Sequence, residues 1–304
     1  MKRVTLLIFK IILLTVVMFL CFAIAAGMAG LGTTNQSPEE ASQAALALVG
    51  VCLINTLVLT YAILRSRWYG LKLIGVVWLI HFGVETFMSQ IETLFFGSAF
   101  NISTTEMQGI VLSGLLRALF FAPAAVFILG KLKPVEAQED TNPCLIMPLR
   151  KWVWQLALLP VIYVCLYFLF GYYIAWQSAD VRQFYAGSIN IKPFFEHMLG
   201  IVQDTPHLFL FQAFRGVLWI GLALPIIKMM TGKWWETPLA IGLLFGSLLT
   251  VQLLLPNPYM PTSVRLAHFI ETSTSTFIYG GAIGWLFRYH YFAKHQLLPE
   301  KRSA

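Results

Sequence analysis

Charged residues are scarce in this sequence, and their scarcity excludes most soluble folds. Only 12% of the 304 residues are Asp, Glu, Lys or Arg, whereas soluble domains carry about 25%. Hydrophobic residues make up 58% of the chain, and the mean hydropathy is +0.73. The apolar runs are continuous over roughly 20 residues, without the polar–apolar alternation of a β-barrel strand. The composition therefore predicts an all-α integral membrane protein.

Cysteines and catalytic motifs are also scarce. No two of the four cysteines, Cys21, Cys52, Cys144 and Cys165, have a metal-ligand spacing, so we expect small buried hydrophobes rather than disulfides or a zinc site. The sequence lacks His-Glu-x-x-His, Gly-x-Ser-x-Gly and a Gly-rich phosphate loop. We predict no metal, no cofactor and no nucleic-acid partner. The expected partner is the lipid bilayer, with a small molecule or a lipid as the candidate ligand.

Eight apolar runs are long enough to cross a bilayer, which takes roughly 20 residues. The first is too long for the apolar part of a signal peptide, so we expect an uncleaved span, although Ala23-Ile24-Ala25 has the form of a cleavage site. A polar segment, 134–151, separates a first half, 1–133, from a second half, 152–288. The predicted spans are 5–30, 44–64, 73–97, 108–130, 152–176, 207–229, 237–255 and 264–287.

Basic residues predict the orientation of these spans. Fifteen of the 21 Lys and Arg residues fall at the termini and in the connections on one side, and only Arg182, Lys192 and Arg265 fall on the other. The positive-inside rule then places both termini in the cytoplasm, with 134–151 as a cytoplasmic linker and 289–304 as a cytoplasmic tail, in a plasma or inner membrane. The long outer loop, 177–206, contains an apolar stretch that predicts a short helix at the outer interface.

A weak internal repeat supports the division into halves. Arg67-Trp68-Tyr69 follows the second span and Lys233-Trp234-Trp235 follows the sixth. Equivalent triplets after equivalent spans indicate two parallel four-helix halves. The alternative is that any cytoplasmic hairpin attracts basic and aromatic residues.

Polar residues interrupt four of the spans at similar depths. Ionisable groups inside a membrane are costly, so they face a partner or a water-filled cavity. We expect Arg117 and Arg215 to pair with Glu85 and Glu271, in an order that the pattern does not settle. A polar site in the outer half of the bilayer follows, with Glu85, Glu92, Arg117, Gln212, Arg215, His268, Glu271 and Ser275 as principal residues and His81, His207 and Tyr279 as secondary ones.

Three functions fit such a site. The sequence favours a small-solute or proton-coupled transporter, because carboxyl groups near the middle of a membrane are typical of proton relays. The first alternative is an enzyme acting on a lipid or hydrophobic substrate, with His268 and Glu271 as acid and base and Arg117 or Arg215 holding a headgroup. The second is an assembly protein in which the charges only fix helix packing. A metal site is disfavoured because His81 and His268 lie at different depths.

Overall fold

The computed structural model describes residues 2–31, 37–97, 102–133, 145 and 147–296. Long helices dominate this part of the chain, and no β-strand is present in it. Seven of them form, or begin, a segment that is long and apolar enough to cross a membrane. They are α1 (Lys2–Met28), α2 (Pro38–Leu64), α3 (Gly70–Phe82), α6 (Thr104–Ile128), α7 (Leu149–Tyr173), α10 (His207–Met229) and α11 (Glu236–Leu248). The last helix is α12, Thr262–Gln296.

Short elements complete several of these passes. A π-helical turn, η1 (Gly83–Phe87), continues α3 into α4 (Met88–Phe95). The 3-10 turns η3 (Ala175–Gln177) and η4 (Val251–Leu254) follow α7 and α11. The long connection between α7 and α10 contains two more helices, α8 (Ala179–Ala186) and α9 (Phe194–Asp204). A short helix in this loop is therefore confirmed.

Seven segments are long and apolar enough to cross a membrane, and they correspond to the first seven predicted spans. The eighth predicted span, 264–287, lies within α12, which is 35 residues long and extends into the predicted tail. Helix α12 is not among the seven, because its polar run, 271–276, lowers its hydropathy. The class, a multi-pass helical membrane protein, is confirmed, whereas the count of eight and the orientation of the termini stay predictions.

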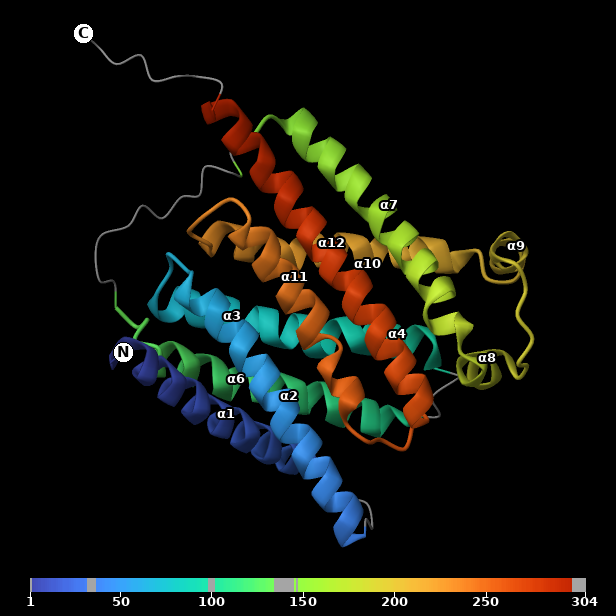
Figure 1. Cartoon of the computed structure of the whole chain (residues 1–304), viewed down its shortest axis with the longest axis horizontal. Helices are drawn as coiled ribbons and strands as arrows, with labels where there is room; N and C mark the ends of the chain where they lie inside the picture. The colour runs from blue at the N-terminus through green and yellow to red at the C-terminus, as the bar shows by residue number, and fades with distance from the viewer. Residues whose placement is uncertain (1, 32–36, 98–101, 134–144, 146, 297–304) are drawn as a thin grey trace.

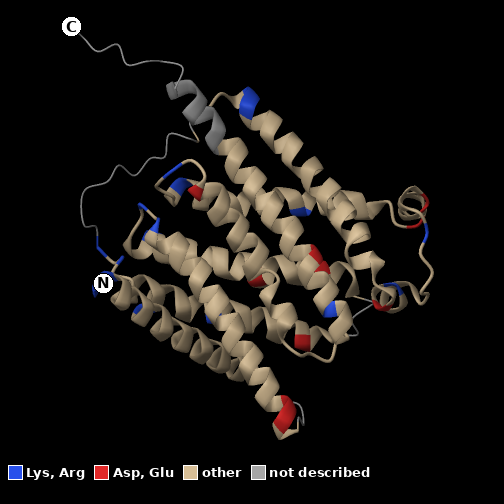
Figure 2. Cartoon of the chain, in the orientation of Figure 1, with Lys and Arg blue, Asp and Glu red and all other residues tan. Residues whose placement is uncertain are grey.

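The helices alternate in direction, so their connections gather at two ends of the bundle (Figure 1). Many of the basic residues lie at the end with the N-terminus (Figure 2), which we call the basic end. The opposite end carries α8 and α9. The positive-inside rule predicts that the basic end is cytoplasmic.

Close backbone contact between α11 and α12 rests on glycines. Gly242 and Gly246 in α11, and Gly280 and Gly284 in α12, are each spaced four residues apart. A Cβ atom at Gly246 would lie 2.8 Å from the carbonyl oxygen of Ser273, and one at Gly280 would lie 2.8 Å from that of Ile241. Small residues spaced in this way let membrane helices approach closely. The two helices consequently lie side by side (Figure 1).

The basic end is closed by bonds between the α2–α3 and α10–α11 connections. The amide of Arg67 donates to the carbonyl of Met229 at 2.7 Å, and the amide of Thr231 donates to that of Arg65 at 2.8 Å. The Arg65 guanidinium also lies 3.1 Å from the carboxylate of Glu236, which is buried. We call this set of contacts the basic-end clasp. It joins the two segments of the predicted repeat.

The two halves of the chain pack by a common plan. In the first half, α1 contacts α2 and α6, and α3 contacts α6. In the second half, α7 contacts α10 and α12, and α11 contacts α12. The order of neighbours is the same, which is compatible with a duplication. The two halves stay a prediction, and most of the linker at 134–151 lies outside the described residues.

The cysteines divide between core and surface. Cys21 and Cys52 are free and buried, as expected of small hydrophobes. The expectation is wrong for Cys165, which is free and exposed on α7. Cys144 lies outside the described residues. Exposure on a spanning helix means that the Cys165 side chain faces the surroundings of the bundle rather than another helix.

Candidate functional site

The most enclosed charges gather around Glu85, whose side chain is fully buried. One carboxylate oxygen, Oε2, lies 2.7 Å from Nη2 of Arg117 and 2.7 Å from Nε2 of His81. The other, Oε1, accepts a hydrogen bond from Nδ2 of Asn55 at 2.9 Å. These four residues form what we call the inner cluster. It ties together α2, the α3–η1 segment and α6.

The local backbone explains how the inner cluster forms. Glu85 lies in the π-helical turn, where the amide of Met88 reaches back to the carbonyl of Gly83. Such wide turns are rare in helices overall, but those that occur are frequently found at functional sites. A Cβ atom at Gly114 of α6 would overlap the side chain of Thr86 in this turn. Glycine therefore lets α6 approach the turn closely, and Arg117, one turn further along, reaches Glu85.

Aromatic rings close off the inner cluster. The Arg117 guanidinium lies 3.9 Å from the ring centre of Phe22, a cation–π contact. The His81 ring meets Phe121 edge-on at 5.6 Å. The inner cluster is thus a fully buried Arg–Glu ion pair that also includes a histidine and an amide.

A second ion pair lies nearer the opposite end. Nη1 of Arg215 lies 2.8 Å from Oε1 of Glu92 and donates to Oε1 of Gln212 at 3.0 Å. Its Nη2 donates to the Met88 carbonyl at 3.2 Å. The Arg215 side chain is 1% exposed, but the Glu92 side chain is 29% exposed. This ion pair is therefore accessible from outside the bundle through the Glu92 side chain.

The expected arginine pairing is half wrong. Arg117 does pair with a predicted carboxylate, Glu85, but Arg215 pairs with Glu92 rather than Glu271. Glu85 lies within the π-helical turn, and Glu92 follows it in α4. A wider turn rotates the residues that follow it, so Glu92 turns away from the Glu85 face toward Arg215 on α10.

Glu271 has a different kind of partner. Its Oε2 lies 3.4 Å from Nδ1 of His268 and accepts a hydrogen bond from the Thr272 hydroxyl at 2.7 Å. Within the described parts of the chain, no Lys or Arg forms an ion pair with Glu271. The His268 side chain is 23% exposed, against 8% for Glu271. Glu271 is thus a buried carboxyl group whose partner is a histidine rather than an arginine.

Tyr185 of α8 lies near both the His268–Glu271 pair and Glu92. Its ring meets the His268 ring edge-on at 5.5 Å. Burial raises the pKa of Tyr185, and the carboxylates of Glu92 and Glu271 raise it further. Both carboxylates therefore lie close enough to act on the same phenol. We call Glu92, Gln212, Arg215, His268 and Glu271, with Tyr185 over them, the outer cluster.

Three predicted residues do not join either cluster. The Ser275 hydroxyl donates to the carbonyl of Thr272 at 3.2 Å, and the Tyr279 hydroxyl donates to that of Gly216 at 3.0 Å. His207 is exposed, with its ring 5.4 Å from that of Phe95. Ser275 and Tyr279 thus contribute to helix packing rather than to a polar site.

Sequence reasoning missed several members of the clusters. Asn55 lies within the apolar second span, and a lone amide there is a signal that could have been used, because polar side chains in spans seek partners on other helices. Gln252 of η4, which donates to the Glu85 carbonyl at 2.8 Å, is another amide within a predicted span and carries the same signal. Tyr185 of α8, within the long outer loop, has no distinguishing pattern in the sequence.

Comparisons with protein-family models, with curated proteins and with solved structures find no match to this chain. In the described residues, no three His, Cys, Asp or Glu side chains are grouped closely enough to hold a metal ion. The class of the protein is therefore defined by its helices and its two polar clusters.

Proposed function

We propose that the protein is a proton-coupled transporter for a small solute, with His268 and Glu271 as the proton-carrying pair. The observation that carries this proposal is the buried Glu271 carboxyl group, which is paired with a histidine. No Lys or Arg among the described residues forms an ion pair with this carboxyl group. A carboxylate held by arginine keeps its charge, whereas an imidazole and a carboxyl group can exchange and release protons. Glu85 and Glu92 are each held by an arginine.

Unequal access to the two clusters supports the same function. The side chains of Glu92 and His268 are 29% and 23% exposed, whereas that of Glu85 is 0% exposed. The basic end is closed by the clasp between the α2–α3 and α10–α11 connections. A carrier needs a central site that opens to one side at a time. In this form, the outer cluster would be open toward the α8 end.

The enzyme alternative has less support. Both arginines that would hold a headgroup are already engaged by carboxylates and are at most 6% exposed. The hydroxyls of Thr274 and Thr276 donate to backbone carbonyls at 2.6 Å, as hydroxyls in membrane helices commonly do. A nucleophile next to His268 is therefore not provided by these residues. Pure helix packing accounts for the inner cluster but not for Glu271.

The test is uptake by purified protein in sealed vesicles under an imposed pH gradient. The vesicles are incubated with a mixture of small polar metabolites, and their contents are measured by mass spectrometry. We expect wild-type protein to accumulate at least one solute, and Glu271→Gln to lose this accumulation, because an amide cannot release a proton. The matched control is Glu39→Gln, at an exposed glutamate in the first turn of α2.

The control should accumulate the same solute as the wild type. Gel filtration of each variant checks that the protein is folded. Gradient-driven accumulation that is unchanged in Glu271→Gln would contradict the proton-carrying role. A wild-type protein that accumulates nothing, while properly folded, would contradict transport itself.

A further inference from the structure

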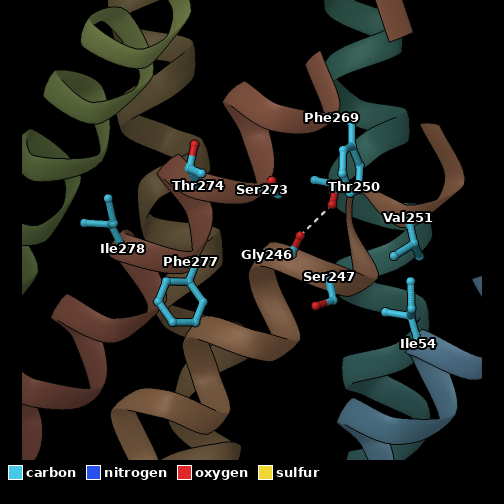
Figure 3. A pocket seen from close by; sticks show the side chains of 10 residues that line it. All are labelled: Ile54, Gly246, Ser247, Thr250, Val251, Phe269, Ser273, Thr274, Phe277 and Ile278. Atoms are coloured by element: carbon cyan, nitrogen blue, oxygen red, sulfur yellow. Dashed lines mark hydrogen bonds between the residues drawn. The ribbon is translucent and has the colours of Figure 1, made fainter. Parts of the chain in front are cut away.

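A hollow of about 450 Å³ opens in the side of the bundle, between α2, α11 and α12. Figure 3 shows the side chains that surround it, which come from all three helices and from η4. Two of them, Phe277 and Ile278, are 40% and 45% exposed, so the hollow opens sideways rather than at an end of the bundle. Its principal lining residues are Ile54, Gly246, Val251, Phe269, Phe277 and Ile278.

Three of the hydroxyl groups around the hollow are hydrogen-bonded to backbone carbonyls. Thr250 donates to the carbonyl of Gly246 at 2.5 Å, the contact that is dashed in Figure 3. Thr274 and Ser273 both donate to the carbonyl of Ile270, at 2.6 and 3.3 Å. None of the described residues that line the hollow is charged. A ligand there would meet mostly hydrocarbon, and a headgroup would find no ionic partner.

The backbone explains why there is space here. Helix α11 ends at Leu248, and the chain turns into η4 before it reaches α12. Just before this turn, the close contact between Gly246 and Ser273 brings α11 against α12. Where the chain then turns away into η4, a gap is left beside Phe269. The gap is a built feature of the crossing between the two helices.

The surface around the hollow is the one that faces lipid. Leu53 and Leu57 of α2 and Ile270 of α12 are exposed hydrophobic residues in spanning positions. The solvent of such a surface is the acyl chains of the bilayer. The hollow is continuous with this surface through the exposed residues Phe277 and Ile278. Its volume lies in the range of about 300–1,000 Å³ that is typical of ligand sites.

We propose that the hollow is a binding site for one acyl chain of a membrane phospholipid, held as a resident lipid. This inference is independent of the transport proposal. The bound chain packs on Val251 of η4, and the next residue, Gln252, donates to the carbonyl of Glu85. The lipid therefore also supports the turn that holds the inner cluster.

The test uses delipidated protein in detergent and a phospholipid with a photoreactive diazirine near the end of one acyl chain. After illumination, labelled residues are mapped by mass spectrometry over a range of probe concentrations. We expect labelling that saturates and that is concentrated on the α11 and α12 residues around the hollow. Unlabelled phospholipid should compete with the probe.

Two variants fill the hollow from different helices, Ser247→Phe in α11 and Ile54→Trp in α2. Each should abolish the saturable labelling while the protein stays monodisperse. The matched control is Ile270→Phe, on the exposed side of α12 and outside the hollow, which should label as the wild type does. The second filling variant decides the matter if the first does not fold.

Three outcomes would overturn the proposal. One is labelling that rises without saturation and spreads over all lipid-facing helices, including α1. Another is unchanged labelling in both filling variants. The third is labelling that falls as protein concentration rises in parallel with dimer formation, because a second copy of the chain would then be the occupant.

Discussion

The inner and outer clusters use the same ion pair in different surroundings. Each joins one arginine to one glutamate, at 2.7 Å for Arg117–Glu85 and 2.8 Å for Arg215–Glu92. The inner carboxylate is 0% exposed, whereas the outer one is 29% exposed. The outer cluster also has one further carboxylate, Glu271, whose ionic partner is a histidine. The difference is between a fully buried ion pair and a partly exposed one that lies beside a second carboxylate.

The surroundings decide how much each ion pair contributes to the free energy of unfolding. Removing charges from water costs several kcal/mol per ion, and pairing repays this cost only when the geometry is good. A pair that is fully buried therefore cannot lose one partner without leaving an uncompensated charge. A pair that is partly exposed can be rescued by water. The two clusters should respond very differently to the loss of one carboxylate.

The largest expected effect is that of Glu85→Ala. It leaves the Arg117 guanidinium buried beside Phe22 without a carboxylate, so we expect a loss of about 3–5 kcal/mol in the free energy of unfolding. Equilibrium unfolding in mixed detergent and SDS micelles measures it. The double variant Glu85→Ala/Arg117→Met should recover most of the loss, because no charge remains buried. A loss no greater than that caused by the same change at Glu92 would contradict the distinction between the clusters.

Gly114→Val should weaken the inner cluster without touching a charge. Any side chain at this position overlaps Thr86 and pushes α6 from the π-helical turn, so Arg117 no longer reaches Glu85. Overpacking of this kind costs about 1–3 kcal/mol. The matched control is Gly75→Val in α3, where an added Cβ meets nothing within 4 Å. Equal unfolding free energies for the two variants would show that the close approach at Gly114 is dispensable.

The sequence predicted the spans well because length and hydropathy decide them locally. The first seven predicted spans overlap the seven apolar segments of the structure. The sequence also placed Glu85, Arg117 and Arg215 within apolar spans, and all three are buried in the structure. Their enclosure could be expected from the cost of charge in lipid. Local rules therefore account for the fold class and for the presence of buried polar groups.

The partners of those groups could not be predicted in the same way. Pairing depends on helix rotation, and a single π-helical turn, which leaves no distinct pattern in the sequence, moved Glu92 to Arg215. The cover by Tyr185 depends on how a loop helix folds back over α12. Asn55 and Gln252 are exceptions, because an amide within an apolar span is visible before the structure. Long-range geometry thus limits prediction of the site more than chemistry does.

A smaller effect is expected for Glu92→Gln. The amide oxygen of the new glutamine can still accept a hydrogen bond from Arg215, and Arg215 keeps its bond to Gln212. The side chain at position 92 is also 29% exposed. The cost should be about 1 kcal/mol, the size of a single hydrogen bond. The measurement is the same unfolding experiment, run in parallel with Glu85→Gln as the comparison. If the two glutamine variants are equally destabilised, exposure is not what distinguishes the clusters.

The smallest effect, and the most direct measure of how the outer cluster is arranged, is a change in the pKa of Tyr185. Two negative carboxylates raise this pKa, so Glu92→Gln and Glu271→Gln should each lower it. It should stay above the ordinary value for tyrosine in both variants, because burial is the largest cause of the shift. Fluorotyrosine incorporated at position 185 and followed by ¹⁹F NMR over an alkaline titration gives the value for each variant. Glu85→Gln is the matched control, since Glu85 is not among the groups that act on Tyr185. A pKa that moves in only one of the two outer variants would mean that Glu92 and Glu271 do not share one site, and the outer cluster would have to be divided.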